Sequence, residues 1–350
     1  MRWRSRTLAG NVMNEEDAGS VRQCVRIDLH HNAYLHCMPA SAPAIPVQNP
    51  PVVLCFSASD PTGGAGLQAD LLTLASLGCH PLTVVTAITV QDTTGVEGVL
   101  PLEAGWIADQ ARALLEDMPV AAFKIGMLGS VEAIAAIAEI VSDYPDIPLV
   151  LDPVLASGRG DQLAGEEMIE AMIALLLPLT HVLTPNSLEA RRLAQEIEEE
   201  DDDAGETPQA VEHAAEHSEK PDRSLSLPDC AQRLILAGCD YVLLTGTHEG
   251  TPQVTNTLYG SHGVVRSDKW ERLPGSYHGS GCTLASAVAA HLANGVPMAE
   301  AVMGAQEYTW RTLAAGFRLG MGQFIPDRMF WSRENGDDDN EVGTVEEVAP

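Results

Sequence analysis

Apolar and polar positions follow one another in a pattern typical of strands that are each followed by a helix. The continuous apolar runs Val52–Ser57 and Thr83–Val90 predict strands that are buried on both faces. Between them, leucines recur at helical spacing within Gly64–Leu77, and Gly78 is expected to end that helix. The alternation continues to residue 314 and predicts one large α/β domain.

The remaining elements follow the same alternation. Further strands are predicted at Ala121–Ile125, Pro148–Leu151, His181–Leu183 and Tyr241–Leu244. Further helices are predicted at Ala104–Leu115, Val131–Val141, Glu166–Leu176, Leu188–Ile197, Leu227–Ala237, Thr283–Ala293 and Met298–Ala314. Two short polar strands, Gln253–Tyr259 and Gly263–Asp268, predict an antiparallel hairpin. Such a chain forms a mainly parallel sheet with helices on both faces, and its ligands sit beyond the carboxyl ends of the strands.

Three segments fall outside this pattern. Residues 1–49 lack periodicity and end in a Pro-rich stretch, so we expect a disordered N-terminal arm before a single domain at 50–332. Residues 196–222 carry twelve acidic residues and one lysine, which predicts a flexible acidic insertion on the surface. Residues 333–350 are expected to form a disordered acidic tail.

The 350-residue chain is strongly acidic, with a net charge of −29. This argues against a nucleic-acid partner, which favours a basic surface. No apolar run reaches the roughly 18–20 residues of a membrane span, so we expect no membrane partner. The seven cysteines include no Cys-x-x-Cys pair, which favours a reducing cytoplasm and no zinc site. The acidity extends into the folded region, where salt adaptation and ordinary acidity both stay open.

A Gly-Ser-Gly-Cys turn at residues 279–282 leads directly into a predicted helix. Gly279, Ser280 and Gly281 leave backbone amides free at the helix start, and the helix dipole favours an anion there, above all a phosphate. Cys282 is the titratable side chain of the turn, and His278 precedes it. The arrangement suggests phosphoryl transfer, with a Gly-rich cap on a core helix as the alternative.

The loop Ser57–Gly66 joins the first strand to the first helix and contains three glycines. Gly64-x-Gly66-x-x-Ala69 is a weak dinucleotide fingerprint, but six residues precede Gly63, whereas a Rossmann turn begins almost at the strand end. None of the three lysines belongs to a Gly-Lys-Ser/Thr phosphate loop. The turn at 279–283 is therefore the main predicted phosphate site.

Other strand ends carry polar residues. Asn186 can cap the helix that follows Thr184, and Glu189 one turn later has the alternative role of reaching a magnesium ion through water. Asp152, at the end of another strand, is a second metal candidate. Gln91 offers an amide that can pair with the edge of a heterocycle, and Met127 can line an apolar slot or simply pack.

Six ordered motifs together resemble the hydroxymethylpyrimidine/phosphomethylpyrimidine kinases of the ribokinase-like superfamily. The resemblance covers about Val52 to Trp331, apart from the acidic insertion. The motifs are Ser59–Asp70, Thr86–Thr93, Lys124–Leu128, Asp152–Val154, Thr184–Glu189 and His278–Leu284. The resemblance implies a three-layer α/β/α sandwich. It also implies ATP-dependent phosphorylation, with Mg²⁺, of a hydroxymethylpyrimidine and then of its monophosphate, for thiamine biosynthesis. A homodimer is also expected.

The resemblance also assigns roles to residues. Cys282 stands where sugar kinases carry an Asp base, and we expect the helix N-terminus to lower its pKa. Gln91 holds the pyrimidine, and Glu189 helps to order magnesium. Further substrate contacts are expected at Gly64, Asp60, Met127 and Val154. Nucleotide contacts are expected at Asn186, Thr245, Gly246 and His278.

The chain departs from the family pattern at Thr245–His248, where many members have Lys-Gly-Gly-His. A charged phosphate contact is therefore expected to be missing.

Two alternative functions stay open. One is a vitamin B6 kinase of the same superfamily, which also acts on hydroxymethyl groups of a flat ring. The other is a pyrimidine-binding sensor without catalysis.

Overall fold

The computed structural model describes residues 24–25, 36–37, 49–158, 160–205 and 225–334. The chain divides into two units, Met1–Asn49 and Pro50–Pro350. In the first unit, β1 (Cys24–Val25) pairs antiparallel with β2 (His36–Cys37). The rest of the predicted arm, and most of the predicted insertion and tail, lie outside the described residues, so their disorder stays a prediction. Within the described ranges, no helix is long and apolar enough to cross a membrane.

A nine-stranded sheet forms the centre of the second unit, as far as that unit is described. Its order is β11-β10-β9-β8-β7-β6-β3-β4-β5, parallel from β4 through β9 and antiparallel at both edges. The strands are β3 (Val52–Ser59), β4 (His80–Gln91), β5 (Val96–Pro101), β6 (Val120–Ile125), β7 (Leu149–Leu151), β8 (Val182–Leu183), β9 (Tyr241–Thr245), β10 (Gln253–Gly260) and β11 (Gly263–Glu271).

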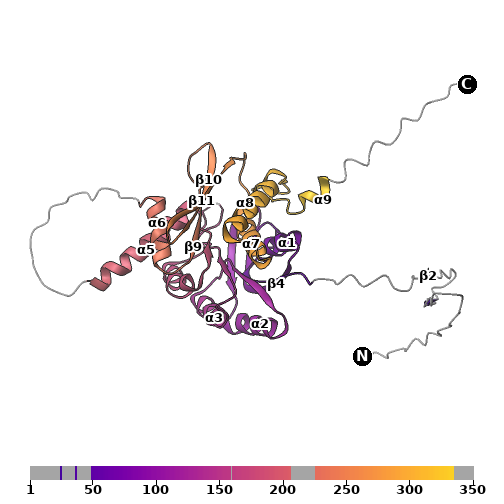
Figure 1. Cartoon of the computed structure of the whole chain (residues 1–350), viewed down its shortest axis with the longest axis horizontal. Coiled ribbons are helices and arrows are strands. Elements are labelled where there is room, and N and C mark those ends of the chain that lie inside the picture. Colours follow the sequence, from indigo (N-terminus) through magenta and orange to yellow (C-terminus); the bar gives the residue numbers. More distant parts are fainter. Residues whose placement is uncertain (1–23, 26–35, 38–48, 159, 206–224, 335–350) are drawn as a thin grey trace, which may run out of the picture. The chain divides into compact units, whose positions relative to one another are not determined.

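Helices cover both faces of this sheet (Figure 1). They are α1 (Gly66–Ser76), α2 (Ala104–Asp117), α3 (Val131–Ser142), α4 (Glu166–Ala171), α5 (Ser187–Gly205), α6 (Leu227–Leu236), α7 (Ser280–Ala293), α8 (Met298–Ala314) and α9 (Phe330–Glu334). A π-helical turn, η1 (Met172–Leu176), and a 3₁₀ turn, η2 (Leu177–Leu179), follow α4.

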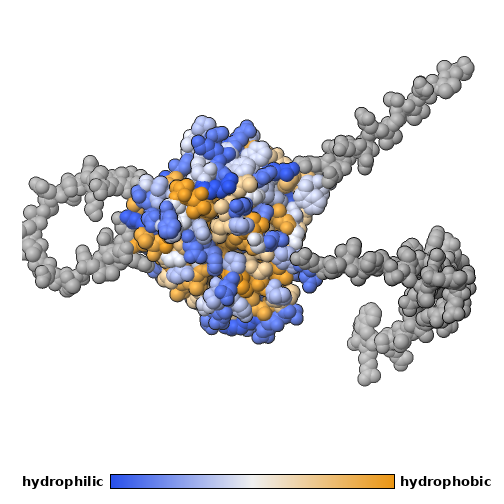
Figure 2. Space-filling model, viewed as in Figure 1, coloured by the Kyte–Doolittle hydropathy of each residue, from blue (hydrophilic) through white to orange (hydrophobic). Residues whose placement is uncertain are grey.

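Strand β3 divides its side chains between two apolar layers. Leu54 and Phe56 pack with α2, α3, α5 and α6, whereas Val53 and Cys55 pack with α1, α7 and α8. Successive strand residues point to opposite faces, so a strand apolar at every position needs both faces covered. The predicted α/β/α sandwich is confirmed. On the face shown in Figure 2, hydrophilic and apolar side chains intermingle at the surface.

The structure differs from the predicted elements at a few points. Strand β5 was not predicted, and α7 begins at Ser280 rather than Thr283. The helix predicted to end at Ile197 continues to Gly205, so the start of the predicted acidic insertion is helical. The predicted helix Glu166–Leu176 changes to π-helical geometry at Met172, shortly before Pro178 interrupts helical hydrogen bonding.

Candidate active site

The parallel strands place the predicted site residues along one edge of the sheet. Asp60 follows β3, Gly126 follows β6 and Asp152 follows β7. Asn186 and Thr245 lie at the ends of β8 and β9 and form a parallel bridge with each other. Because carboxyl ends of parallel strands meet at one edge, motifs far apart in sequence lie around a common space.

The turn before α7 has the geometry expected of an anion site. Gly279 is the N-cap, with a φ of 76° that favours glycine. The first helical hydrogen bond runs from the Thr283 amide to the Gly279 carbonyl, at 2.9 Å. The amides of residues 280–282 come before that bond, so they are the free donors of the helix N-terminus. The turn therefore presents three amides and a positive helix end to a ligand.

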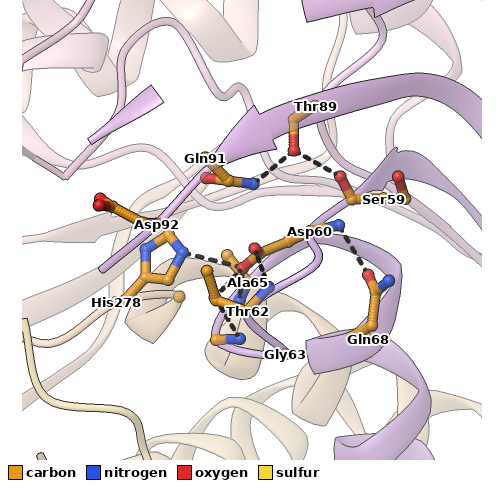
Figure 3. Close-up of polar contacts among 12 residues, drawn as sticks. Ser59, Asp60, Thr62, Gly63, Ala65, Gln68, Thr89, Gln91, Asp92 and His278 are labelled. Carbon is orange, nitrogen blue, oxygen red and sulfur yellow. Dashed lines mark hydrogen bonds and ion pairs between the residues drawn. The ribbon is translucent and has the colours of Figure 1, made fainter. Parts of the chain in front are cut away.

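The glycine loop after β3 is organised by the buried carboxylate of Asp60 (Figure 3). It accepts hydrogen bonds from the amides of Thr62 (2.8 Å) and Ala65 (2.6 Å), and the Thr62 hydroxyl adds a third. His278 Nε2 lies 2.8 Å from Asp60 Oδ2. Burial would raise the pKa of Asp60, but these hydrogen bonds together hold it below its ordinary value. Asp60 thus links the glycine loop to the turn before α7.

Two glycines allow this loop and the anion turn to touch. A Cβ added at Gly64 would lie 2.3 Å from the His278 ring. A Cβ added at Gly279 would lie 2.0 Å from the Gly64 carbonyl oxygen. Neither position accepts a side chain without movement of the backbone or ring. The predicted contacts of Asp60 and Gly64 with substrate, and of His278 with nucleotide, stay predictions.

Cys282 lies in the first turn of α7, where its thiol hydrogen-bonds with the Asp152 carboxylate and the Gly66 amide. Burial raises the pKa of this thiol to about 12, and the carboxylates of Asp152 and Asp70 add to the rise. The expected lowering of the pKa of Cys282 by the helix N-terminus is therefore wrong. Lys124 and the Gly66 amide do oppose the rise, but they do not overcome burial.

A buried ion pair beneath the site was not predicted. Lys124 Nζ lies 2.8 Å from Asp70 Oδ1, and both side chains are fully buried. The Ser286 hydroxyl donates to the same carboxylate at 2.7 Å. Burial would lower the pKa of Lys124, but Asp70, Cys282 and Asp152 together hold it above its ordinary value. The sequence does carry a signal of this pair: Lys124 lies within an apolar strand, and Asp70 lies on the apolar face of a helix.

Asp152 and Glu189 form the acidic part of the site. Burial raises the pKa of Asp152 to about 6, with Asp70 adding and Lys124 opposing. Burial also raises the pKa of Glu189 to about 8, and the Asp152 charge is the next cause. Each of these carboxylates is therefore held in surroundings that disfavour its charge. Oxygen donors of this kind fit Mg²⁺, which uses one or two carboxylates together with waters and phosphate oxygens.

Glu189 and Asn186 also form a capping box at the start of α5. Asn186 Oδ1 accepts from the amides of Leu188 and Glu189, at 2.9 and 3.0 Å. Glu189 Oε2 accepts from the Asn186 amide at 2.9 Å. Capping accounts for the position of both side chains. The Glu189 carboxylate also accepts a hydrogen bond from the Leu155 amide, so the loop after β7 helps to hold it.

The predicted substrate residues lie on neighbouring strand ends. Gln91 ends β4, and its amide nitrogen donates to the Thr89 hydroxyl at 2.8 Å (Figure 3). The Met127 carbonyl accepts from the Thr86 hydroxyl at 2.6 Å. Val154 follows β7, and its amide donates to the Asp152 carbonyl. Their contact with a pyrimidine stays a prediction.

The loop after β9 is held in place by residues of β10 and by Arg272. The Gly246 amide donates to Asn256 at 3.1 Å, and a Cβ at Gly246 would lie 2.4 Å from the Thr255 carbonyl. Arg272 donates to the carbonyls of Thr247, Glu249 and Thr251. A guanidinium is thus attached to the loop in which many family members carry a lysine.

Comparison with known proteins agrees with this geometry. The model of the phosphomethylpyrimidine kinase family matches residues 60–327. The hydroxymethylpyrimidine/phosphomethylpyrimidine kinase of Streptomyces coelicolor is 36% identical over 288 residues, which are 81% of this chain and 95% of that protein. Phosphomethylpyrimidine kinase from Clostridium difficile 630 has a similar crystal structure, with 33% identity and a TM-score of 0.57, covering 74% of this chain and 97% of that one. Staphylococcus aureus pyridoxal kinase in complex with AMP-PCP and pyridoxal shows 27% identity and a TM-score of 0.66, covering 82% and 96%.

Proposed function

The chain belongs to the phosphomethylpyrimidine kinase family, and we propose that the turn at 279–282, with Asp152 beside it, carries out its phosphoryl transfers. The activity is ATP-dependent phosphorylation of 4-amino-5-hydroxymethyl-2-methylpyrimidine and then of its monophosphate, for thiamine biosynthesis. One observation above all supports the assignment of phosphoryl transfer to this turn and Asp152. A Cβ added at Gly281 would lie 3.7 and 3.8 Å from the Asp152 carboxylate oxygens, so free amides and a carboxylate border the same space.

The anion turn stabilises the charge of the transferred phosphoryl group. Phosphoryl transfer depends mainly on positioning and on neutralising charge on the equatorial oxygens. The amides of Ser280, Gly281 and Cys282 supply fixed donors for those oxygens. Gln91 orients the pyrimidine through its amide, with Met127 and Val154 beside the ring. Asn186, Thr245, Gly246 and His278 form the nucleotide side.

Cys282 receives the proton of the substrate hydroxyl. With a pKa raised to about 12, the thiol is protonated in the free site, so it must release a proton before it accepts one. Its hydrogen-bond partner Asp152 has a pKa of about 6 and is ionised at neutral pH. The S–H proton therefore passes to Asp152 as the hydroxyl proton moves to sulfur and the oxygen bonds to phosphorus.

Glu189 and Asp152 would hold Mg²⁺ through bound waters, which leaves the Asp152 carboxylate able to accept the thiol proton. When bound, the ion neutralises the phosphate oxygens of ATP. The raised pKa of both groups supports this assignment, because burial, and after it a neighbouring carboxylate, disfavours each charge, and a divalent cation would offset that penalty.

Mass spectrometry of the products tests the function. Purified protein is incubated with ATP, Mg²⁺ and hydroxymethylpyrimidine, and mono- and diphosphate are followed in time. Monophosphate that appears first and is converted to diphosphate supports both transfers. Monophosphate alone restricts the chain to the first transfer, and no pyrimidine phosphate overturns the function.

A vitamin B6 ring is the second candidate substrate. Pyridoxal kinases overlay this chain with TM-scores of 0.66 to 0.68, compared with 0.57 for the Clostridium difficile phosphomethylpyrimidine kinase. Overlap of the folds is therefore at least as good with the B6 enzymes, although sequence identity is lower. The ratio of kcat/KM for hydroxymethylpyrimidine and pyridoxal, measured in parallel, decides between the two rings.

The assembly and location of the protein complete the proposal. A cytoplasmic homodimer agrees with an ATP-dependent activity and with a cluster of exposed apolar residues on β4 and β5. Ile88 is 47%, Val90 61% and Leu100 63% exposed, which is unusual for large apolar side chains that share one face of a hairpin.

A further inference from the structure

A short segment after α8, residues 323–328, contacts the loop after β4, the glycine loop after β3 and the chain that leads into the anion turn. We call it the C-terminal strap. It lies between α8 and α9, and its end is anchored to α8 by the Tyr308 hydroxyl, which donates to the Arg328 carbonyl at 2.9 Å. None of the site motifs in the sequence includes this segment, and the proposed mechanism does not use it.

The first part of the strap joins the substrate side to the anion turn. The Gln323 amide donates to the Thr93 carbonyl at 2.8 Å, two residues beyond Gln91. The Gln323 side chain donates to the Ser276 hydroxyl at 2.6 Å. The Phe324 amide donates to the Ser276 carbonyl at 2.9 Å, and the His278 amide donates to the Phe324 carbonyl at 2.8 Å. The strap thus runs beside the chain that leads into the anion turn.

The last residue of the strap, Arg328, joins the glycine loop to α7. Its side chain is almost completely buried, with 2% of the residue exposed. Nη2 donates to the Gly64 carbonyl at 2.6 Å and to the Thr283 hydroxyl at 2.9 Å. Nε also donates to Thr283 at 3.1 Å, and Nη1 reaches the Gly63 carbonyl at 3.4 Å. The Thr283 hydroxyl in turn donates to the Gly279 carbonyl at 2.8 Å.

All four of these guanidinium bonds go to neutral oxygens. Burial lowers the pKa of Arg328, which is the sign that its surroundings disfavour the charge. A buried cation held by neutral carbonyls is a poor source of stability, because its loss of hydration is costly. What the guanidinium does supply is a rigid planar fork that bonds two separate backbone segments at once. That geometry holds the Gly64 carbonyl against Gly279.

We propose that Arg328 is a positioning residue of the kinase, which fixes the glycine loop against the first turn of α7 through Thr283 and Gly64. The amides of residues 280–282 and the Cys282 thiol then keep one orientation toward the transferred phosphoryl group. Misplacement of reacting groups by about 1 Å can cost about 100-fold in rate. This inference rests on the proposed function of the turn and adds a residue that does not touch the reacting atoms.

The test compares Arg328→Lys and Arg328→Met with Arg333→Met. Arg333 lies five residues later, pairs with Asp327 at 3.0 Å, and has a side chain that is 67% exposed. We expect both Arg328 variants to lose about 100-fold in kcat per folded molecule, with KM for the pyrimidine within about threefold. Lysine keeps the charge but lacks the fork, so it should not rescue the rate. Arg333→Met should keep the rate of the wild type.

A second readout needs no substrate. Amide hydrogen exchange should increase in Arg328→Lys both at residues 60–66 and at residues 276–283, while α3 keeps the protection of the wild type. Arg333→Met should change neither loop. Exchange that increases in only one of the two loops, or equally throughout the chain, contradicts a coupling role.

The two readouts separate the failure of each proposal. A wild type that phosphorylates no pyrimidine overturns the proposed function, while hydrogen exchange still decides whether Arg328 couples the loops. An active wild type whose Arg328→Lys variant keeps kcat per folded molecule within about threefold shows that Arg328 serves only folding, and overturns the inference.

Discussion

At the scale of single residues, Cys282 has the clearest test, because the proposed mechanism uses its sulfur rather than its volume. We expect Cys282→Ala to lower kcat by about 10²–10⁴-fold, the usual contribution of general base catalysis, with KM changed far less. Steady-state kinetics with hydroxymethylpyrimidine measures both. Cys230→Ala is the control, since it also removes a helix thiol, but one that is fully buried in α6 within the other apolar layer. An unaffected kcat in Cys282→Ala would remove the proton-accepting role.

The raised pKa of Glu189 predicts that the stability of the folded chain depends on pH. Its pKa is about 8 in the folded chain and ordinarily 4.5, so the folded state binds the proton more tightly. The stability that this proton provides is full below pH 4.5 and is lost as pH rises to 8. In Mg²⁺-free buffer, Glu189→Gln should therefore raise Tm relative to wild type at pH 8, by about 2–4 °C for each kcal/mol relieved, and much less at pH 5.

The control for that experiment is Glu249→Gln. Arg191 lies 3.0 Å from the Glu249 carboxylate and lowers its pKa, so the sign of its contribution is reversed. This variant should leave Tm unchanged or lower it above pH 5. A Tm difference for Glu189→Gln that is constant from pH 5 to pH 8 would show that the charge of Glu189 meets no penalty in the folded chain.

At the scale of elements, the contact between the anion turn and the glycine loop requires a glycine at 279. Gly279→Ala and Gly263→Ala both place alanine at a positive φ, 76° and 99°, which costs roughly 1–2 kcal/mol. At Gly263 nothing lies within 4 Å of the new Cβ, whereas at Gly279 it meets the Gly64 carbonyl at 2.0 Å. Urea unfolding should therefore show a larger loss for Gly279→Ala, together with loss of kinase activity. Equal losses with activity retained would mean that the two loops separate freely.

The repeating elements could be predicted because their signals are local. Continuous apolar strands and leucines at helical spacing each reflect burial within one short segment. Strand β5 was missed because Val96–Pro101 is an edge strand with four exposed positions and contains Gly98. Edge strands that contact little of the core carry almost no apolar periodicity.

The site residues, too, could be predicted where their signal is local and were missed where it is not. Residues at the ends of predicted strands were identified, since their position follows from the order of the elements. Arg328 and the Lys124–Asp70 pair were missed, because their partners lie 45 or more positions away in the chain. The pKa of Cys282 was misjudged for a related reason: the helix N-terminus is visible in the sequence, but the degree of burial that outweighs it is not.

At the scale of the whole molecule, the exposed apolar face of β4 and β5 predicts the assembly. Ile88 lies directly opposite Leu100, and Val90 follows on the same face, so the three side chains are neighbours on the surface. Leu100→Glu places a charge in this face and should convert a dimer, with twice the 37.3 kDa mass of the chain, into monomers. Sedimentation equilibrium measures the mass. Val264→Glu is matched in exposure, at 62% against 63% for Leu100, but lies on β11 at the opposite edge of the sheet, and should leave the dimer intact. A wild type that sediments as a monomer, or a dimer that only Val264→Glu dissociates, would place the contact elsewhere or exclude it.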